Sequence, residues 1–335
     1  MDRWIRILGI VLSVQVVLAV LVWWGGGEPE PAGGERFLAW APEDVTEIRI
    51  APGGQEDQEG QGVTLRRQGE GWVVARLDDL PAAGERIGDL LQKLHESRLG
   101  LPVGTTAATQ KRFKVADEAF GRRLELKNRQ GGERVLYVGE SAGPGRVYAR
   151  LEGQDAIHEL PVRRYELGTR PVDWADRELL HLDPADIRKV ALDDLVLVHG
   201  DQGWTLADAK PDEHLDSGKV QRLIDQLTRL NFIDVVPEAE ARKGEPLMTV
   251  RVERKSGPPV EYRIFTRTGD EQGLPQYVLE IEGKPWHFVL SGHTVARLVE
   301  ADRDSLLSRA EKKAGGEQEQ ASPATDNASQ ATDND

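Results

Sequence analysis

The sequence predicts an α+β protein built as a tandem duplication of one module, a mostly antiparallel sheet plus a helix, preceded by one transmembrane helix. First, a Trp-centred strand pattern occurs twice, as GEGWVVA around Trp72 and as DQGWTLA around Trp204, 132 residues later. Second, an amphipathic helix pattern follows each of these strands. Third, a run of 18 uncharged residues near the N-terminus is long enough to cross a membrane as a helix.

The predicted membrane anchor extends from Ile7 to Trp24, with the sequence ILGIVLSVQVVLAVLVWW. As a helix it spans about 27 Å, close to the roughly 30 Å of hydrocarbon in a bilayer. Trp4 precedes the run and Trp23 and Trp24 end it, at the depths where interfacial tryptophans are enriched. We therefore expect a single-pass protein held in the membrane by residues 7–24.

The basic residues around this run predict its orientation. Arg3 and Arg6 lie before it, whereas the first basic residue after it is Arg36. The positive-inside rule places residues 1–6 in the cytoplasm and the bulk of the chain on the periplasmic side of the inner membrane. The alternative is a cleaved signal peptide, but the run is longer than a usual h-region and no A-x-A site follows it.

The composition of the remaining chain predicts its domain boundaries. Residues 25–36 are rich in Gly, Pro and Glu and predict a linker. Residues 311–335 contain no Leu, Ile, Val or aromatic residue, so they predict a disordered acidic tail. Between these segments we place α+β module 1 at residues 37–181 and α+β module 2 at residues 182–310.

Each module is expected to contain the same elements in the same order. PEDVTEIRI at 42–50 corresponds to PADIRKVAL at 184–192, and both predict a strand entered through an acidic turn. The Trp strand and the helix come next, and Asp216 and Ser217 are candidate N-caps of the second helix. Two hairpins, then a helix with an ADR phrase, complete each module. The helix stripes consist of Ile87, Leu90, Leu91 and Leu94 in module 1, and of Val220, Leu223, Ile224 and Leu227 in module 2.

Two long segments resemble the domain of unknown function 4340 family. They are KRFKVADEAFGRRLELKNRQGGERVLYVGESAGPGRVYARLEGQDAIHELP at 111–161 and DWADRELLHLDPADIRKVAL at 173–192, and the similarity covers most of residues 40–307. The resemblance implies the order anchor, Trp strand, helix, YVGE strand, VYAR strand and DR-LL junction. It also implies an accessory role in the envelope, beside an ABC-type transport system similar to the gliding-motility transporter. It implies no catalytic residue.

Composition excludes several classes of function. The chain has 57 acidic residues against 43 Lys and Arg, for a net charge of −14, which argues against a nucleic-acid partner. It has no cysteine, so disulfides, thiolate metal sites and cysteine nucleophiles are excluded.

One segment matches a catalytic motif. GESAG at 139–143 fits the G-x-S-x-G nucleophile elbow, which requires a strand, a sharp turn and a helix to expose Ser141. Pro144 and Gly145 break a helix at that point and a new strand begins, so a hairpin loop is the better interpretation. The glycines of this segment also lack the G-x-x-x-x-G-K-[ST] pattern and the following helix of a phosphate cradle. These glycines are Gly139, Gly143 and Gly145.

The histidines, paired acids and tryptophans all have structural interpretations. No histidine forms an H-E-x-x-H or H-x-H pattern, so we expect no metal and no cofactor, and we expect His158 and His287 on strand surfaces. The acidic pairs Asp78–Asp79 and Asp193–Asp194 sit beside turns, where solvated loop residues are the rule. Trp72, Trp204 and Trp286 are expected in the core, and Trp40 and Trp174 in packing or partner contacts. The histidines are His95, His158, His181, His199, His214, His287 and His293.

Three functional hypotheses follow from these observations. The first is a non-catalytic, membrane-anchored accessory or scaffold subunit of an ABC-type transport system, with the permease and ATPase as partners. The second is a periplasmic ligand-binding module, for polysaccharide or peptide, that uses a cleft between the two repeats. The third is a hydrolase, which requires Ser141 or a carboxylate pair in a deep pocket with assignable partners.

Overall fold

The computed structural model describes residues 35–54, 61–211, 213–237, 244–267 and 275–308. Within these ranges no helix is both long enough and apolar enough to span a membrane. The predicted anchor at residues 7–24, most of the linker and the predicted tail lie outside the described residues.

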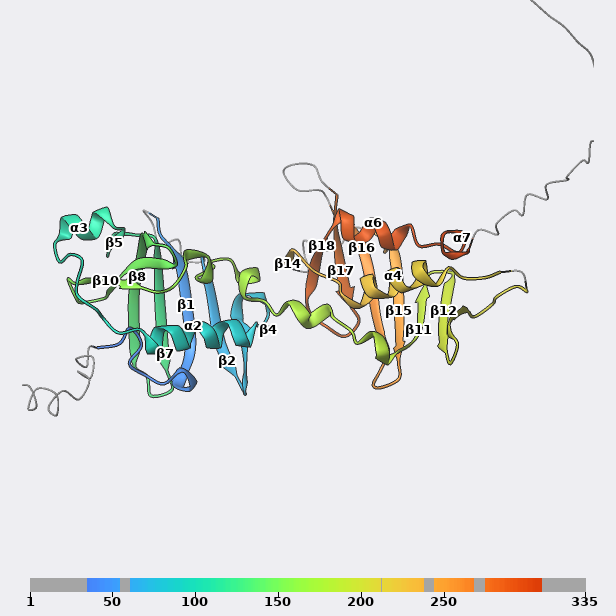
Figure 1. The fold of residues 1–335 in the computed structure, drawn as a ribbon, viewed down its shortest axis with the longest axis horizontal. Helices are drawn as coiled ribbons and strands as arrows, with labels where there is room; N and C mark the ends of the chain where they lie inside the picture. Colours follow the sequence, from blue (N-terminus) through green and yellow to red (C-terminus); the bar gives the residue numbers. More distant parts are fainter. Residues whose placement is uncertain (1–34, 55–60, 212, 238–243, 268–274, 309–335) are drawn as a thin grey trace, which may run out of the picture.

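The described residues form two eight-stranded, antiparallel sheets that lie side by side along the long axis of the molecule (Figure 1). The first sheet has the order β10-β9-β8-β7-β1-β2-β3-β4. Its strands are β1 (Val45–Pro52), β2 (Val63–Gln68), β3 (Gly71–Val74), β4 (Leu80–Pro81), β7 (Arg122–Asn128), β8 (Glu133–Gly143), β9 (Arg146–Leu151) and β10 (Ile157–Leu160).

The second sheet has the order β13-β12-β11-β15-β16-β17-β18-β14. Its strands are β11 (Ile187–Leu192), β12 (Leu195–Gly200), β13 (Gly203–Leu206), β14 (Asp234–Val236), β15 (Met248–Arg254), β16 (Val260–Arg267), β17 (Gln276–Ile281) and β18 (His287–Ser291). Seven strands of each sheet follow the same order. The eighth differs, because β4 extends the first sheet beside β3 whereas β14 extends the second beside β18. These two edge strands lie at the junction of the modules (Figure 1).

The repeat extends to single hydrogen bonds at the start of each module. A short 3-10 turn precedes the first strand in both, η1 (Pro42–Asp44) and η6 (Pro184–Asp186). In module 1 the Arg129 amide donates to the Asp44 carbonyl at 3.0 Å, and in module 2 the Lys255 amide donates to the Asp186 carbonyl at 2.7 Å. The register also shifts at the same place, after Val45 in β1 and after Ile187 in β11. The two modules therefore share one backbone plan, bulge included.

One long helix covers one face of each sheet (Figure 1). α2 (Gly84–Glu96) and α4 (Ser217–Thr228) both bury the predicted apolar stripe. Asp216 is the N-cap of α4, because its carboxylate accepts the Lys219 amide at 3.0 Å, and Ser217 is the first helical residue. The shorter helices are α3 (Ala107–Arg112), α6 (Gly292–Val299) and α7 (Arg303–Leu306), and β5 (Val115–Ala116) pairs with β6 (Ala119–Phe120).

The closing segment of module 1 differs from the predicted helix. Module 2 closes with α6 and α7, as expected, but module 1 closes with three 3-10 turns. Pro161, Gly168 and Pro171 fall within this segment and interrupt any longer helix. The turns are η3 (Arg164–Glu166), η4 (Pro171–Trp174) and η5 (Arg177–Leu180), and η2 (Ala75–Leu77) lies between β3 and β4.

The tryptophans only partly follow the expected core placement. Trp72 is buried, but Trp204 and Trp286 are only partly buried, and Trp286 lies in the loop before β18 rather than in a strand. The Trp286 indole donates to the Asp78 carbonyl of module 1 at 3.1 Å. Trp174, which precedes the second module, is completely buried. Trp286 therefore contributes a contact between the modules, which the repeat pattern alone does not predict.

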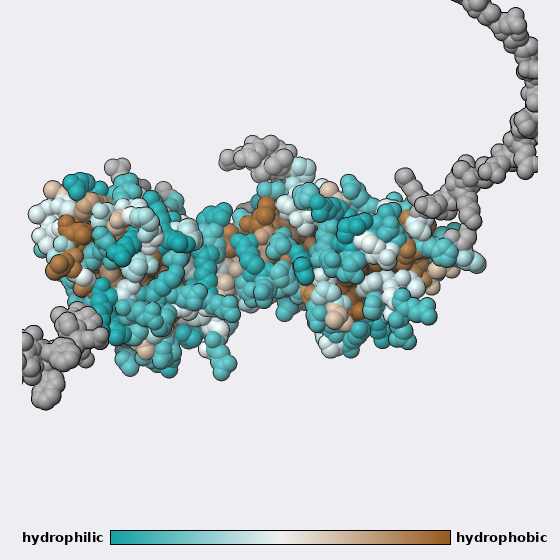
Figure 2. All heavy atoms as spheres, in the orientation of Figure 1, coloured by the Kyte–Doolittle hydropathy of each residue, from teal (hydrophilic) through white to brown (hydrophobic). Residues whose placement is uncertain are grey.

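The surface is largely hydrophilic on the face seen in Figure 2, with hydrophobic patches at the outer end of module 1 and near the junction. The exposed apolar side chains include Leu101, Val103 and Ile233. Most apolar side chains instead lie in the core between each sheet and its helix.

Candidate functional site

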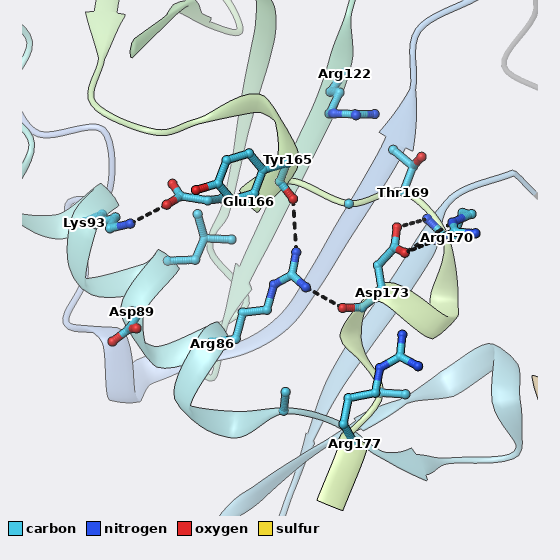
Figure 3. A pocket seen from close by; sticks show the side chains of 14 residues that line it. Arg86, Asp89, Lys93, Arg122, Tyr165, Glu166, Thr169, Arg170, Asp173 and Arg177 are labelled. Carbon is cyan, nitrogen blue, oxygen red and sulfur yellow. Dashed lines mark hydrogen bonds and ion pairs between the residues drawn. The ribbon is translucent and has the colours of Figure 1, made fainter. Parts of the chain in front are cut away.

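A cavity of about 850 Å³ lies between α2 and the closing segment of module 1 (Figure 3). Residues from three elements line it: the exposed flank of α2, the segment from Tyr165 to Arg177, and the first residue of β7. The lining residues are Ala83, Arg86, Asp89, Leu90, Lys93, Arg122, Tyr165, Glu166, Gly168, Thr169, Arg170, Asp173, Ala175 and Arg177.

Arg86 holds the closing segment against α2. Its guanidinium donates to the Asp173 carbonyl at 2.5 Å and to the Tyr165 carbonyl at 3.1 Å. The same group lies over the indole of buried Trp174, 4.5 Å from the ring centroid, and that indole donates to the Gly168 carbonyl at 2.8 Å. All of these partners are neutral, so Arg86 keeps an uncompensated positive charge beside the cavity.

Two other basic residues of the cavity are neutralised by carboxylates. Lys93 donates to Glu166 at 2.7 Å, and Arg170 donates to Asp173 at 2.7 Å. Partial burial by itself raises the pKa of Glu166, but hydrogen bonds from Lys93 and the Arg163 amide outweigh it and lower that pKa below its ordinary value. Glu166 is therefore ionised at neutral pH and is poorly suited to exchange protons there.

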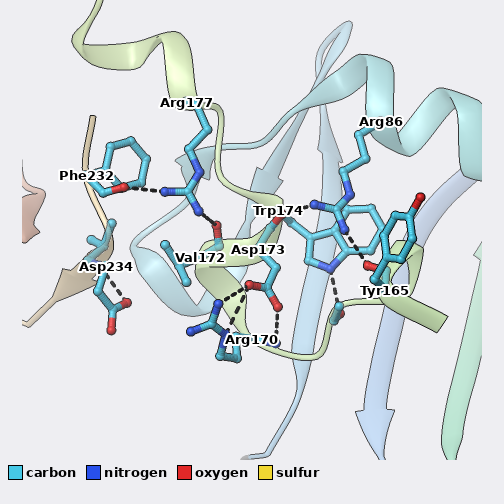
Figure 4. A network of polar contacts seen from close by, with 11 residues as sticks. Arg86, Tyr165, Arg170, Val172, Asp173, Trp174, Arg177, Phe232 and Asp234 are labelled. Carbon is cyan, nitrogen blue, oxygen red and sulfur yellow. Dashed lines mark hydrogen bonds and ion pairs between the residues drawn. The ribbon is translucent and has the colours of Figure 1, made fainter. Parts of the chain in front are cut away.

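Arg177 connects the cavity to module 2 (Figure 4). Its guanidinium donates to the Phe232 carbonyl at 2.5 Å and to the Val172 carbonyl at 3.1 Å, and it lies 4.7 Å from the centroid of the Phe232 ring. Burial lowers the pKa of Arg177, although an arginine stays charged at neutral pH. Like Arg86, it is bonded to neutral carbonyls.

Arg122 forms one wall of the cavity from the sheet. It shares its face of β7 with Leu124 and Leu126, which are completely buried beneath the helix. Among the described residues its guanidinium has no hydrogen-bond or ion-pair partner, and its Nε is buried without one. Burial and the charge of Arg164 lower the pKa of Arg122, and Asp173 acts in the opposite direction. Figure 3 shows Arg122 beside Thr169, apart from the paired groups.

Module 2 has a related cavity of about 700 Å³ between α4 and the segment of α6 and α7. Lys219, at the helix position of Arg86, donates to the Ser305 carbonyl at 2.7 Å and the Leu307 carbonyl at 3.2 Å. Gln226, at the position of Lys93, donates to the Thr294 carbonyl at 2.6 Å. Its lining residues are Lys219, Arg222, Leu223, Asp225, Gln226, Arg297, Glu300, Ala301, Ser305 and Leu306. Each module therefore has a cavity beside its long helix, and at the same helix position Arg86 and Lys219 donate to backbone carbonyls.

The candidate nucleophile is part of a β-hairpin, as the sequence favoured. Ser141 is exposed within β8 and pairs with Val147 of β9. Its hydroxyl donates to the carbonyls of Gly143 at 3.1 Å and Arg146 at 3.4 Å, so it serves the turn of its own hairpin. No strand-turn-helix elbow forms at this segment.

The glycines beside Ser141 also have structural roles. A Cβ on Gly139 would lie 1.8 Å from the Phe113 carbonyl oxygen, so the strand needs glycine to pass this backbone. Gly143 and Gly145 have φ values of 133° and 73°, which the hairpin turn requires. The segment continues into β9, not into a helix that could hold a phosphate.

The histidines stay apart. His158 of β10 contacts the Gly100 carbonyl through Nδ1 at 2.9 Å, and His287 of β18 lies 3.5 Å from Glu280. Both are buried, which differs from the expected surface placement. His95 contacts Arg36 at 2.6 Å. Across the described parts of the chain, no group of three or more His, Asp or Glu side chains is arranged to hold a metal ion.

The acidic pairs are turn residues, as expected. Asp78, Asp79 and Asp193 have φ values of 51°, 53° and 43°, in the left-handed region that Asp tolerates in turns. Asp79 pairs with Arg66 at 2.6 Å. Asp193 accepts the Thr249 amide at 3.2 Å.

Sequence reasoning did not find the arginine-lined cavity. The pattern RRLELKN places Arg122 in alternation with Leu124 and Leu126, and a charge on the apolar face of a strand was the available sign. The other lining residues come from segments far apart in the chain, which only the fold brings together.

Comparison with known proteins identifies the family of the chain. The family model described as Domain of unknown function (DUF4340) matches residues 72–247, more than half of the chain. No curated protein and no solved structure matches it. The matched range extends from the Trp strand of module 1 through the cavity and the junction into module 2. The chain belongs to the DUF4340 family.

Proposed function

We propose that this protein is a non-catalytic, single-pass envelope protein that acts as an accessory or scaffold subunit of an ABC-type transport system. In this proposal residues 7–24 anchor the chain in the inner membrane and residues 1–6 lie in the cytoplasm. The two sheet modules then lie on the periplasmic side, where they contact the permease. The uncharged run and the arginines before it support the anchor.

The ionisable groups in the cavity of module 1 support the non-catalytic part of the proposal. Glu166 and Asp173 are held in ion pairs, and the pKa of Glu166 is lowered away from neutrality. Efficient general acid–base catalysis needs a pKa near the operating pH. Arg86 and Arg177 are committed to backbone carbonyls that brace the closing segment. These contacts favour a rigid binding or scaffolding element over a reaction centre.

The transporter association is tested by cross-linking in intact cells. The full-length chain is tagged at its C-terminus, cross-linked briefly, solubilised in mild detergent and purified, and its partners are identified by mass spectrometry. The control carries residues 1–36 fused to an unrelated periplasmic domain at matched expression. We expect permease and ATPase subunits of one ABC system with the full chain only. Intact, membrane-bound protein without these subunits would contradict the accessory role.

A second candidate is a periplasmic ligand-binding module. The specific observation in its favour is the size of the cavity in module 1, because ligand sites commonly enclose about 300–1,000 Å³. This cavity lies within module 1 beside the junction, whereas the sequence suggested a cleft between the repeats. Its lining is basic on balance, with five Lys and Arg side chains against three Asp and Glu side chains.

A further inference from the structure

The strongest unexplained feature of the molecule is a charge with no partner. Arg122 lines the cavity of module 1, and its guanidinium has no hydrogen-bond or ion-pair partner among the described residues. Its Nε is buried, so water does not solvate that atom. A buried polar group left unsatisfied costs free energy, and more so when it is charged. A partner that arrives with a ligand would remove this cost.

The second module provides an internal comparison. Arg122 pairs with Val138 of β8, and in the same register Met248 pairs with Ile264 of β16. The next residues on this face are Leu124 in module 1 and Val250 in module 2, both completely buried. Met248 is only 5% exposed, so the fold accommodates an apolar side chain at this position. Module 1 therefore carries an arginine that the shared architecture does not require.

The surroundings of Arg122 favour an anion. Arg86 and Arg177 donate to carbonyls and form no direct ion pair among the described residues, although Asp173 and Asp234 act on Arg177 through space, whereas Lys93 and Arg170 are paired with carboxylates. The cavity is thus positive although the chain carries a net charge of −14. A guanidinium matches the geometry of a carboxylate or phosphate, with two parallel N–H bonds.

The volume and the rim indicate more than an inorganic ion. A cavity of about 850 Å³ is far larger than one phosphate group needs. Tyr165 lines the cavity and is 66% exposed, whereas Leu90 of α2, which also lines it, is only 3% exposed. An exposed aromatic ring beside a cationic cavity suits a ligand with a flat or apolar body.

We propose that the cavity between α2 and the closing segment of module 1 binds a small organic anion, whose carboxylate or phosphate group is held by Arg122 in the positive field of Arg86 and Arg177. Tyr165 covers the body of the ligand at the opening. This site goes beyond the accessory role and gives the ligand-binding candidate a ligand class. Binding requires no transporter partner, so failure of the cross-linking experiment leaves it untouched.

The test is isothermal titration calorimetry on the purified full-length chain in mild non-ionic detergent at low ionic strength. Phenyl phosphate and phenylacetate are the anionic probes, and benzyl alcohol is the matched neutral probe. We expect one site per chain for at least one anion, no binding of benzyl alcohol, and weaker binding at 0.5 M salt because ions screen the attraction. A short-chain phosphatidylglycerol, dihexanoyl, tests whether a lipid headgroup competes for the same site.

Three variants connect binding to the residue. Arg122→Met introduces the residue type that module 2 has at the equivalent position. It is expected to lower the affinity for the anion at least 10-fold, in line with loss of a charge-assisted hydrogen bond. Arg122→Lys keeps the charge but loses the two parallel N–H donors of the guanidinium, and should bind the anion with intermediate affinity. Arg222→Met removes an exposed arginine from the other cavity and should change affinity less than twofold.

Several results would overturn the site. Equal affinity of the wild type and Arg122→Met, or no heat with either anion up to 10 mM, removes the proposed role of Arg122. If benzyl alcohol binds as tightly as the anions, the cavity does not recognise charge, and the proposed anion site is wrong although the chain still binds a ligand. Urea unfolding followed by tryptophan fluorescence checks that Arg122→Met folds. If it does not fold, wild-type affinity in Arg122→Lys refutes bidentate recognition.

Discussion

At the scale of single residues, the arginine of the ADR phrase makes different contacts in the two modules. Arg303 donates to Glu213 at 2.5 Å and to Asp208 at 2.8 Å, and so ties α7 to the loop before α4. In module 1 the corresponding arginine of the ADR phrase, Arg177, donates to carbonyls and reaches Phe232 of the next module. The same three-residue sequence, ADR, therefore provides an ion pair in module 2 and a junction contact in module 1.

The ion pair in module 2 predicts a pH dependence of stability. A hydrogen bond from Arg303 lowers the pKa of Glu213 to about 2, from an ordinary value of 4.5. A lowered pKa in the folded state stabilises the fold above the unfolded pKa, and this contribution disappears as pH falls from about 4.5 to about 2. We expect the urea midpoint of the full chain to fall over this range, and to fall less in Glu213→Gln.

The matched control for this prediction is Glu282→Gln, which changes an exposed glutamate whose contact with Arg263 is 3.8 Å. Tryptophan fluorescence at each pH gives the midpoints. If Glu213→Gln and the wild type lose the same stability between pH 5 and 2, the pair does not account for the acid sensitivity.

At the scale of elements, glycines show how packing decides the effect of one chemical change. Gly88 is exposed in α2, and a Cβ there would meet nothing within 4 Å. Gly139 lies in β8, where a Cβ would meet the carbonyls of Phe113 at 1.8 Å and Lys114 at 2.7 Å. The segment after α3 crosses the strand so closely that only glycine fits.

We therefore expect a glycine-to-alanine substitution to change the free energy of unfolding in opposite directions at these two positions. Gly88→Ala should raise the free energy of unfolding by about 0.5–1 kcal/mol, because alanine restricts the unfolded chain and favours the helix. Gly139→Ala should lower it by about 1–3 kcal/mol, the usual cost of overpacking. Urea unfolding of both full-length variants measures the changes. A neutral effect of Gly139→Ala would mean that the segment at Phe113 moves aside freely.

At the scale of the whole molecule, the strands that lie at the junction of the modules are β4 of the first sheet and β14 of the second (Figure 1). β4 ends the first sheet, and β14 lies at the opposite end of the second order. Trp286 donates across the junction to the Asp78 carbonyl at 3.1 Å, and Arg177 donates to the Phe232 carbonyl at 2.5 Å. These contacts join the two copies, whereas α3 and the β5–β6 pair, which have no counterpart among the described residues of module 2, lie at the outer end of module 1 (Figure 1).

The proposed membrane topology is testable because the chain has no cysteine. Asp2→Cys and Glu70→Cys each introduce one thiol, before the predicted anchor and in the exposed β2–β3 turn respectively. A membrane-impermeant maleimide should label Glu70→Cys in intact spheroplasts, and Asp2→Cys only after permeabilisation. The cysteine-free chain is the control for background labelling. Equal labelling of both variants in intact spheroplasts would reject the cytoplasmic N-terminus.

The sequence by itself determined the repeated part of the fold. Ile87 and Val220 start the helix stripes, and both stripes are buried as predicted, because a 3.6-residue period has one apolar face to hide. The hairpin around Ser141 was also predictable, since Pro144 and Gly145 together disfavour a helix at this point.

Only the tertiary structure decided the cavity and the junction. Arg122 and Arg177 lie 36 and 91 residues after Arg86 along the chain, and no local pattern relates the three. The sequence predicts Trp286 in the core and Trp174 in packing or partner contacts, yet Trp174 is fully buried and Trp286 spans the junction. Local periodicity specifies which face of an element is apolar, whereas the residues gathered around a cavity depend on how the faces of distant elements pack.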